Sequence, residues 1–277
     1  MELAMINDTV VDMDQAKVSA HDRGLLFGDG VYEVIRFCNG KLFEMEAHMS
    51  RFEHSLREMD MLSQVDLAVI RNRVDRALDQ SKLRDAKIYF HVTRGSSPRA
   101  HDYNNSWQPE FLLTVRAVKD HHHQETGRAI IHPDWRWKRC DIKSLNLLAN
   151  VLAKHAATKA GAYEAILVDE KGMITEATSS SVLMVKDGAL WSAPLQANIL
   201  PGITRSLLLK WAEDLGLEPQ EESFSLVDLK NAEELMITGT GTEVMGITQL
   251  DGQTIGNGKL GNYTKQFQKK LVAAMQF

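Results

Sequence analysis

The sequence has few or none of the features that mark several large classes of protein. It contains two cysteines, Cys38 and Cys140, in 277 residues. This is too few for a disulfide framework and favours a reduced, cytoplasmic protein. No stretch approaches about 18 consecutive apolar residues, so a membrane-spanning helix is not expected. The first residues lack a basic segment followed by an apolar one, so a secretion signal is not expected either. Internal repeats and low-complexity tracts are also missing.

The charge is mixed and slightly negative. Lysine and arginine total 32, aspartate and glutamate total 37, and the formal net charge is -5. A chain with this balance is poorly suited to nucleic acid as its main partner. Hydrophobic residues make up 44% of the chain, which is enough for one large domain or two medium ones.

The order of apolar and turn-forming residues predicts an α+β (mixed α/β) protein with two domains. In the first half we expect a hairpin of strands at 31–37 and 41–44, helices at 45–59 and 67–78, and strands at 87–93 and 111–118. The polar segment 119–127 is interpreted as a linker between domains at 1–118 and 128–277.

In the second half we expect strands at 129–132, 163–168, 181–186, 189–192, 235–238 and 244–250, with helices at 145–160, 204–215 and 260–275. The predicted strands come in runs and hairpins, and this arrangement favours mixed sheets over a doubly wound fold.

Lys143 stands at a change of pattern. It follows residues 135–142, an aromatic-bearing run expected to be strand-like, and Ser144 then precedes an apolar, alanine-rich segment. Serine is a good N-cap, because its hydroxyl can accept from a backbone N–H of the first helical turn. Lys143 would then lie beside the positive end of a helix, where an ammonium is disfavoured. A lysine with more neutral character suits Schiff-base chemistry. Taken alone, a solvated lysine is the alternative.

Two segments have the composition of anion-binding turns. Residues 200–205 place Gly202 before a predicted helix whose first backbone amides could bind a phosphate. Residues 238–243 follow a predicted strand with alternating small and hydroxyl residues, which can surround phosphate oxygens. An ordinary helix cap and a plain surface turn are the respective alternatives. Neither segment has the P-loop pattern.

Four charged residues are further candidates. Arg51 flanks the apolar stripe of the 45–59 helix, so it could reach a buried anion or merely extend to solvent. Arg99 and His101 lie two residues apart on an extended loop, and an arginine fork matches a carboxylate, although the loop could simply be solvated. Glu176 ends a predicted strand among small residues. It could pair with a protonated ring nitrogen, or it could be a surface residue.

A metal site is not expected. Residues 121–123 are three consecutive histidines, but adjacent side chains on a loop do not converge on one ion. Cys140 is interpreted as a packing residue, since no Cys–His spacing typical of a nucleophile accompanies it. The segment Gly28-Asp29-Gly30 lacks the third glycine of a dinucleotide-binding turn.

Together these residues resemble one family. The order found here is typical of the fold-type IV, class IV pyridoxal-phosphate aminotransferases, and it comprises His21–Glu33, Arg51, Lys143, Glu176, Thr204 and Thr240. The resemblance runs over nearly the whole chain. Within the family, residues 93–101 and 139–148 are most similar to the D-amino-acid transaminases (D-alanine transaminases).

The resemblance implies a site for pyridoxal 5'-phosphate. Lys143 would bind the cofactor as a Schiff base and move the proton at the substrate Cα. Glu176 would hold the protonated ring nitrogen. Phosphate binding would fall to Arg51, Ile203, Thr204 and Thr240, and Arg139 would lie near the ring hydroxyl. The chain departs from the family pattern at Gly239, where the D-specific enzymes commonly have serine, and this removes one potential hydrogen bond.

The resemblance also implies a substrate-carboxylate trap formed by Tyr32, Arg99 and His101. The arginine and the histidine would come from a neighbouring subunit, so a homodimer is expected. Strand alternation adds a further hypothesis, because it places Tyr32, Val34 and Arg36 on one face. Arg36 would then lie near the side-chain pocket, and the protein would accept acidic donors such as D-aspartate and D-glutamate.

These inferences predict a transaminase that moves the amino group of a D-amino acid, such as D-alanine, to a 2-oxo acid, such as 2-oxoglutarate, by a ping-pong mechanism. Alternatives within the fold are a branched-chain L-aminotransferase, an aminodeoxychorismate lyase and an R-selective amine transaminase. A cofactor-free binder of anionic metabolites is the alternative outside it.

Overall fold

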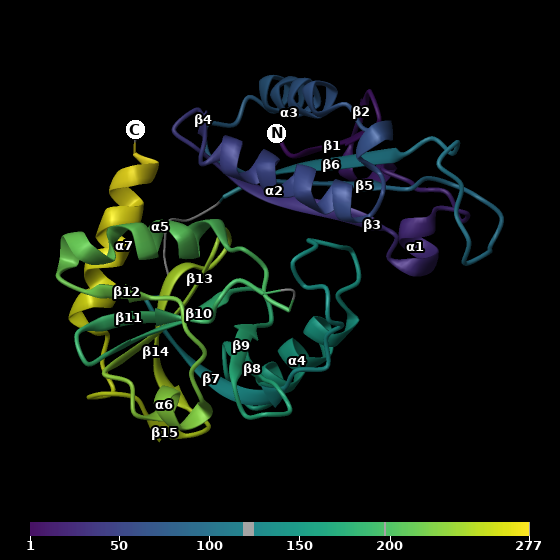
Figure 1. Ribbon diagram of the computed structural model, residues 1–277. Helices are drawn as coiled ribbons and strands as arrows, with labels where there is room; N and C mark the ends of the chain where they lie inside the picture. The colour runs from purple at the N-terminus through teal and green to yellow at the C-terminus, as the bar shows by residue number, and fades with distance from the viewer. Residues whose placement is uncertain (119–124, 197, 277) are drawn as a thin grey trace. The chain divides into compact units, whose positions relative to one another are not determined.

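The computed structural model describes residues 1–118, 125–196 and 198–276 (Figure 1). The chain divides into two compact units. Unit 1 comprises Met1–His121 and Ile142–Leu147, and unit 2 comprises His122–Asp141 and Leu148–Phe277. The segment that contains Lys143 therefore belongs to unit 1, whereas the sequence division assigned it to the second domain. Most of the predicted 119–127 linker lies outside the described residues, and Thr126 already belongs to a strand.

Unit 1 is built on a six-stranded sheet in the order β2-β1-β6-β5-β3-β4, with every pairing antiparallel. Its strands are β1 (Leu3–Ile6), β2 (Thr9–Val11), β3 (Gly30–Cys38), β4 (Lys41–Leu42), β5 (Ala86–Thr93) and β6 (Glu110–Ala117). The β3–β4 hairpin turns at Asn39 and Gly40, which both have positive φ, at 50° and 83°. This is the turn that the Asn-Gly pair predicts.

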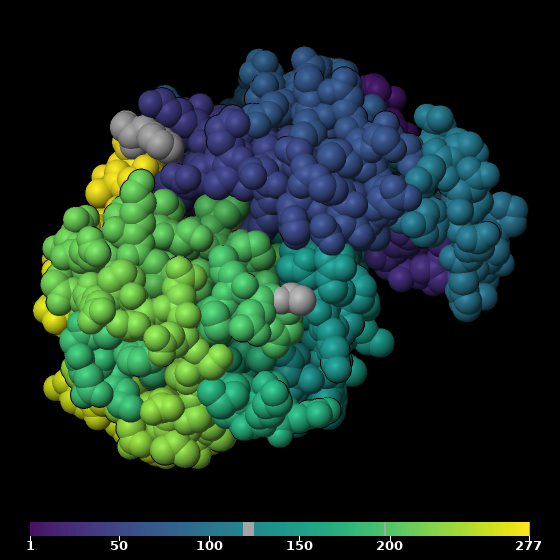
Figure 2. Space-filling model, in the orientation of Figure 1, coloured from purple at the N-terminus to yellow at the C-terminus, as the bar shows by residue number. Residues whose placement is uncertain are grey.

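Two helices cover one face of this sheet, α2 (Met45–Glu58) and α3 (Leu67–Ser81) (Figure 1). Their side chains form a closed layer over the strands in the same view (Figure 2). The covered face carries the alternate apolar residues of the strands, and Phe90 of β5 meets Phe52 of α2 edge to face at 5.1 Å between ring centroids. Because strand side chains alternate between faces, the residues between them point to the opposite face.

Unit 2 is built on a nine-stranded mixed sheet in the order β12-β11-β10-β13-β14-β7-β8-β9, with β15 paired to β14. Its strands are β7 (Thr126–Pro133), β8 (Glu164–Val168), β9 (Ile174–Ala177), β10 (Ser181–Lys186), β11 (Ala189–Ser192), β12 (Glu218–Gln220), β13 (Glu234–Gly239), β14 (Glu243–Leu250) and β15 (Gln253–Thr254). The β7–β8, β7–β14 and β11–β12 pairings are parallel. This mixture of parallel and antiparallel strands agrees with the predicted α+β class.

The longer helices of unit 2 are α4 (Leu148–Lys159), α5 (Ile203–Ala212) and α7 (Asn262–Met275). The short helices are α1 (Arg23–Phe27) in unit 1 and α6 (Leu226–Lys230) in unit 2, and single 3-10 turns lie at Met13–Gln15, Leu62–Gln64 and Glu213–Leu215. Among the helices of the described ranges, none is both long and apolar enough to cross a membrane.

The helix expected at about 145–160 is confirmed, although it begins only at Leu148. One local prediction was wrong, because the run 135–142 forms turns and bends instead of a strand. The sequence analysis also missed β1, β2, β12, β15, α1 and α6. These elements have five residues or fewer, so they are too short to show a period.

Candidate active site

Lys143 is held by the strand β3. The amide of Tyr32 donates to the Lys143 carbonyl at 2.9 Å, and the amide of Leu145 donates to the Gly30 carbonyl at 2.9 Å. The Lys143 amide donates to Ser55 Oγ of α2 at 3.1 Å. Its Nζ lies 4.2 Å from the centroid of the Tyr32 ring, a favourable position for a cation. The lysine is thus fixed at the start of β3.

The predicted N-cap at Ser144 is not formed. The Ser144 amide donates to the carbonyl of Ile142, and α4 begins only four residues later, at Leu148. The backbone at 143–145 is engaged by β3, so it cannot also enter a helix. Lys143 therefore does not lie at the positive end of a helix. Backbone pairing and the Tyr32 ring hold the lysine instead.

A buried ion network lies on α2 and β3. Arg51 reaches a buried anion, as the sequence suggested it could, and that anion is Glu33. Arg51 Nε and Nη2 donate to the two Glu33 oxygens at 2.8 Å each, and His48 Nδ1 lies 2.8 Å from Oε2. Glu33 is fully buried and His48 is nearly so. A fork-to-fork pair of this kind fixes the arginine in one orientation.

Burial and charge oppose each other at Glu33. Burial alone raises the pKa of its carboxyl, but the positive charge and hydrogen bonds of Arg51, together with the hydrogen bond of His48, lower the pKa to about 2. For His48, burial lowers the pKa, and the interaction with Glu33 only partly opposes this effect. The network therefore favours a carboxylate between a guanidinium and a neutral imidazole.

The sequence analysis missed Glu33 and His48. A signal for Glu33 was present, because strand alternation places it on the same face as Val31 and Ile35, both of which are core residues. A glutamate on a core face requires a cation nearby, and Arg51 was already a candidate to reach a buried anion.

The opposite face of the unit 1 sheet carries the predicted substrate residues. Tyr32 and Val34 are partly exposed there, and Arg36 is buried. Tyr32 packs beside Tyr89 of β5 at 5.7 Å between centroids. The Tyr89 hydroxyl lies 2.9 Å from His91 Nδ1, and burial raises the pKa of Tyr89. The structure therefore brings these side chains into one aromatic surface beside Lys143.

Arg36 belongs to a row of cations on that face. It pairs in register with Lys87 of β5, which pairs in register with Arg116 of β6. Residues directly opposite each other on adjacent strands project their side chains to the same face. The row is two residues along β3 from Val34 and four from Tyr32, at one end of the aromatic surface.

Arg99 and His101 lie on the loop between β5 and β6 and are exposed. Both contact the ring of Phe27 in α1. Arg99 Cζ lies 5.3 Å from the ring centroid, and the His101 ring packs edge to face at 5.6 Å. Within the described part of the chain, neither side chain forms a hydrogen bond or ring contact with Lys143 or Tyr32. One chain thus brings Arg99 and His101 together but does not join them to the lysine.

Glu176 lies on β9 in unit 2 and is buried. Its carboxylate accepts a hydrogen bond from Arg136 Nη1. Arg136 also donates to Asp134, from Nε at 2.9 Å and from Nη2 at 2.8 Å. Hydrogen bonding to Arg136 outweighs the effect of burial and lowers the pKa of Asp134. The arginine therefore holds two carboxylates in place.

Arg136 was not among the residues predicted for the site, whereas Arg139 was. Arg139 pairs with Asp141 at 2.9 and 2.8 Å, and its side chain is 42% exposed, against 7% for Arg136. The two arginines are three residues apart in an irregular segment, where no period indicates which one points inward. Arg136 is the arginine that contacts Glu176.

One predicted phosphate-binding segment lies at the start of helix α5, and the other lies at a turn between two strands. Ile203 and Thr204 form the first turn of α5, and Thr204 is buried. Gly202 precedes them with no side-chain cap, and a Cβ there would lie 2.5 Å from Ser181 Oγ. The first amides of α5 thus lie beside a hydroxyl-bearing strand, an arrangement that suits a phosphate.

Thr240 lies in the turn between β13 and β14. Thr238, at the end of β13, donates its hydroxyl to the Glu243 carbonyl at 2.6 Å. A Cβ on Gly239 would lie 3.3 Å from the Ser179 carbonyl oxygen, so there is little room for a side chain. The departure from the family pattern at Gly239 therefore coincides with close backbone packing.

Comparison with known proteins shows the family of the chain. Residues 30–250 match the model of the family described as amino-transferase class IV. The chain is 40% identical over 269 residues to the D-alanine aminotransferase of Bacillus licheniformis, covering 96% of this chain and 95% of that protein. It is 38% identical over 273 residues to the D-alanine aminotransferase of Staphylococcus aureus strain N315, covering 97% and 96%.

Solved structures show the same fold. The branched-chain amino acid aminotransferase of Escherichia coli has a TM-score of 0.89 at 24% identity, covering 98% of this chain and 93% of that one. The branched-chain aminotransferase of Thermoproteus uzoniensis has a TM-score of 0.87 at 23% identity, covering 99% and 94%. The family model spans most of the chain and the D-alanine aminotransferases match nearly all of it, so this protein belongs to the class IV aminotransferases.

Proposed function

We propose that this protein is a pyridoxal-phosphate-dependent transaminase that moves the amino group of a D-amino acid, such as D-alanine, to a 2-oxo acid, such as 2-oxoglutarate. The observation that carries the proposal is the identity of 40% to a D-alanine aminotransferase over 96% of the chain. The solved structures are below 25% identity and support the fold alone.

The residues present suit pyridoxal phosphate. The uncapped start of α5, with Ile203 and Thr204, offers backbone amides and a hydroxyl to a phosphate. Thr240 adds a second hydroxyl, and Glu176 supplies a buried carboxylate for a protonated ring nitrogen. Lys143 supplies the amine. Together they provide the hydrogen-bond donors, the amine and the carboxylate that a phosphorylated pyridine aldehyde requires.

When bound, the cofactor supplies an electron sink for the pair that the substrate Cα–H bond leaves behind. Lys143 would hold the cofactor through its amine, and the same amine would move the proton at the substrate Cα. Glu176, oriented by Arg136, keeps a negative charge at the ring nitrogen. Arg51, held by Glu33, contributes positive charge for the phosphate. We keep Arg139 as a candidate contact of the ring hydroxyl and add Arg136 as a second candidate for that contact.

We propose that Tyr32, Arg99 and His101 bind the substrate carboxylate, with the arginine and the histidine supplied by the partner in a homodimer. Two observations support this. Arg99 and His101 project from an exposed loop without contacting Lys143 in the same chain. Helix α4 exposes an apolar stripe of Leu148, Val151 and Leu152, at 68%, 59% and 47%, and such stripes are typical of protein interfaces.

The cation row supports acidic substrates. Arg36, Lys87 and Arg116 stand in register at one end of the aromatic surface, where a second carboxylate on the substrate would be attracted. We expect Arg36→Ala to lower the turnover of D-glutamate more than that of D-alanine. Equal D-glutamate turnover in the two proteins would remove Arg36 from this role.

We also propose that the protein is cytoplasmic, because two cysteines, Cys38 and Cys140, are too few for a disulfide framework.

The first experiment follows the visible absorbance of the purified protein with pyridoxal phosphate. D-Alanine and L-alanine are added in separate cuvettes. Bleaching with D-alanine alone is the expected result. Bleaching with L-alanine alone would favour a branched-chain L-aminotransferase. A yellow protein indifferent to both would favour a lyase or an amine transaminase, and a colourless protein would favour a non-catalytic binder of anionic metabolites.

A further inference from the structure

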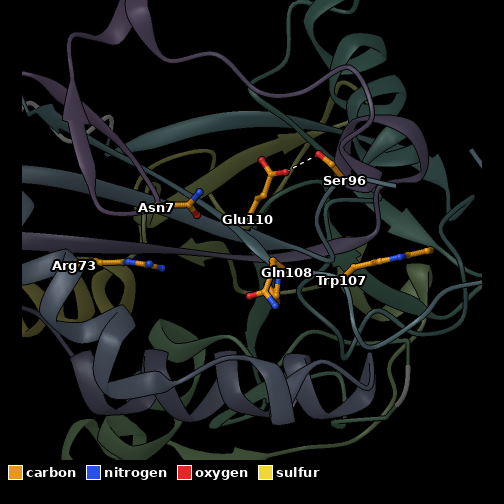
Figure 3. Close-up of a pocket in the computed structure, with 7 residues that line it drawn as sticks. Asn7, Arg73, Ser96, Trp107, Gln108 and Glu110 are labelled. Atoms are coloured by element: carbon orange, nitrogen blue, oxygen red, sulfur yellow. Dashed lines mark hydrogen bonds between the residues drawn. The ribbon is translucent and has the colours of Figure 1, made fainter. Parts of the chain in front are cut away.

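The loop that carries Arg99 and His101, here called the clamp loop (residues 95–109), is closed at its base. Gly95 has a φ of +92°, and a Cβ there would lie 2.0 Å from the Gln108 carbonyl oxygen, so only glycine fits. Ser96 Oγ donates to Glu110 Oε1 at 2.6 Å. Figure 3 shows this bond among residues that line a hollow. The hollow has a volume of about 730 Å³. The base is therefore fixed, but these bonds do not reach the tip.

The side chain of Arg23, in α1, binds the backbone of the residues at the tip of the clamp loop. Its Nη1 donates to the carbonyl oxygens of Ala100 at 2.7 Å and Asp102 at 3.2 Å, and its Nη2 donates to that of His101 at 3.2 Å. Three consecutive carbonyls thus accept from one guanidinium. The first and third directly flank His101, and the first belongs to the residue after Arg99. A planar fork with five donors can make this set of bonds, whereas an ammonium cannot span it.

Arg23 is itself held rigidly. It is 3% exposed, and its Nε donates to Asp29 Oδ2 at 2.7 Å. Arg94 donates to the same carboxylate from Nε at 3.0 Å. Helix α1 also carries Phe27, whose ring contacts Arg99 and His101 and has its centroid 4.8 Å from Arg23 Cζ. A single short helix therefore fixes both the backbone and the side chains of the clamp.

We propose that Arg23, oriented by Asp29, is a positioning residue that places Arg99 and His101 for recognition of the substrate α-carboxylate. This inference rests on the proposed function, in which those two side chains bind that carboxylate. Arg23 does not touch the substrate. Displacement of a binding group by about 1 Å can reduce an enzyme's efficiency about a hundredfold, so loss of the three carbonyl bonds should act on substrate binding.

The test compares the wild-type holoenzyme with Arg23→Lys and with Arg73→Lys as a matched control. Arg73 lines the hollow at the base of the clamp loop, but its side chain donates hydrogen bonds to Asp8 and not to the loop backbone. We expect Arg23→Lys to raise the KM for D-alanine about tenfold or more while kcat changes less than about twofold. Arg73→Lys should match the wild type. A purely structural defect would lower the active fraction, and hence kcat, and leave KM in place.

A second measurement reports the loop itself. Arg99 is exposed and precedes Ala100, so trypsin can cut after it when the loop is loose. We expect faster cleavage after Arg99 in Arg23→Lys and in a second variant, Asp29→Asn, than in the control. Unchanged cleavage in both variants, or an unchanged KM in Arg23→Lys, would overturn the proposal.

A parallel Arg99→Ala variant separates this inference from the proposed function. It should raise the KM for D-alanine and retain bound cofactor. If its KM is unchanged, Arg99 does not bind the carboxylate, and the clamp of the proposed function fails. If its KM rises but that of Arg23→Lys does not, the clamp stands and the positioning role of Arg23 is refuted.

Discussion

Replacement of Glu33 by glutamine should destabilise the protein in a way that depends on pH. Glu33 is fully buried between Arg51 and His48. Glutamine keeps the shape but removes the charge, so Arg51 is left buried without its counter-ion. Breaking a buried pair in this way costs about 3–5 kcal/mol. We therefore expect Glu33→Gln to lower the free energy of unfolding at neutral pH by about that amount.

The pH dependence follows from the pKa. The carboxyl has an ordinary pKa of 4.5 and a folded pKa of about 2, so its ionisation favours the folded state by about 3 kcal/mol above pH 4.5. That contribution is lost as the pH falls from 4.5 toward 2, and about 1.4 kcal/mol of it is gone near pH 3.5. Glutamine does not titrate. The stability gap between the wild type and Glu33→Gln should therefore narrow by about 1.4 kcal/mol between about pH 5.5 and 3.5.

Urea unfolding at the two pH values, with and without added pyridoxal phosphate, measures the gap. His48 adds a second pH dependence to the free energy of unfolding. Its pKa is lowered in the folded protein, so the unfolded chain binds the proton more readily and acid favours unfolding. Both proteins are therefore also compared in a His48→Asn background. A gap that stays constant with pH in that background would show that Glu33 is not an ionised, charge-stabilised group.

Two further predictions concern the cores. Burial raises the pKa of the Cys140 thiol to about 12. Because the thiolate is the reactive form, iodoacetamide near pH 8 should label Cys140 far more slowly in the folded than in the urea-unfolded protein. Equal labelling rates would contradict the burial. Phe52 is fully buried against Phe90, and Phe52→Ala should lower the free energy of unfolding by about 3–5 kcal/mol in urea titrations; a loss below about 1 kcal/mol would mean that the core collapses around the site.

Features set by neighbouring residues could be predicted from the sequence. The Asn39-Gly40 pair specifies a tight hairpin by itself, and its two positive φ values confirm this. The spacing of apolar residues located α2 and α3 within one to three residues of their observed ends. Strand pairing could not be predicted in this way. Strands β1 and β6 lie more than 100 residues apart in the chain, and no local pattern specifies that two such strands are neighbours.

In the candidate site, residue types were easier to predict than residue contacts. Arg51 was identified as a cation that could reach a buried anion, but the anion was left open, and it is Glu33. Arg136 was not predicted, because it lies in a segment without regular structure, and there only the packing decides which side chain turns toward Glu176. The chemistry of a site follows from composition and order, whereas its partners follow from the tertiary fold.

The backbone around Lys143 shows where a local rule fails. Ser144 has the chemistry of an N-cap, and an apolar helix does follow, so the local rule favoured a helix start there. The backbone amides of residues 143 and 145 instead donate to Ser55 and Gly30, and the Lys143 carbonyl accepts from Tyr32. A cap is worth about 1 kcal/mol. Three long-range hydrogen bonds of about 0.5–1.5 kcal/mol each outweigh it. The same bonds fix the lysine beside the strand that carries Tyr32. A helix start at Ser144 would have removed that constraint.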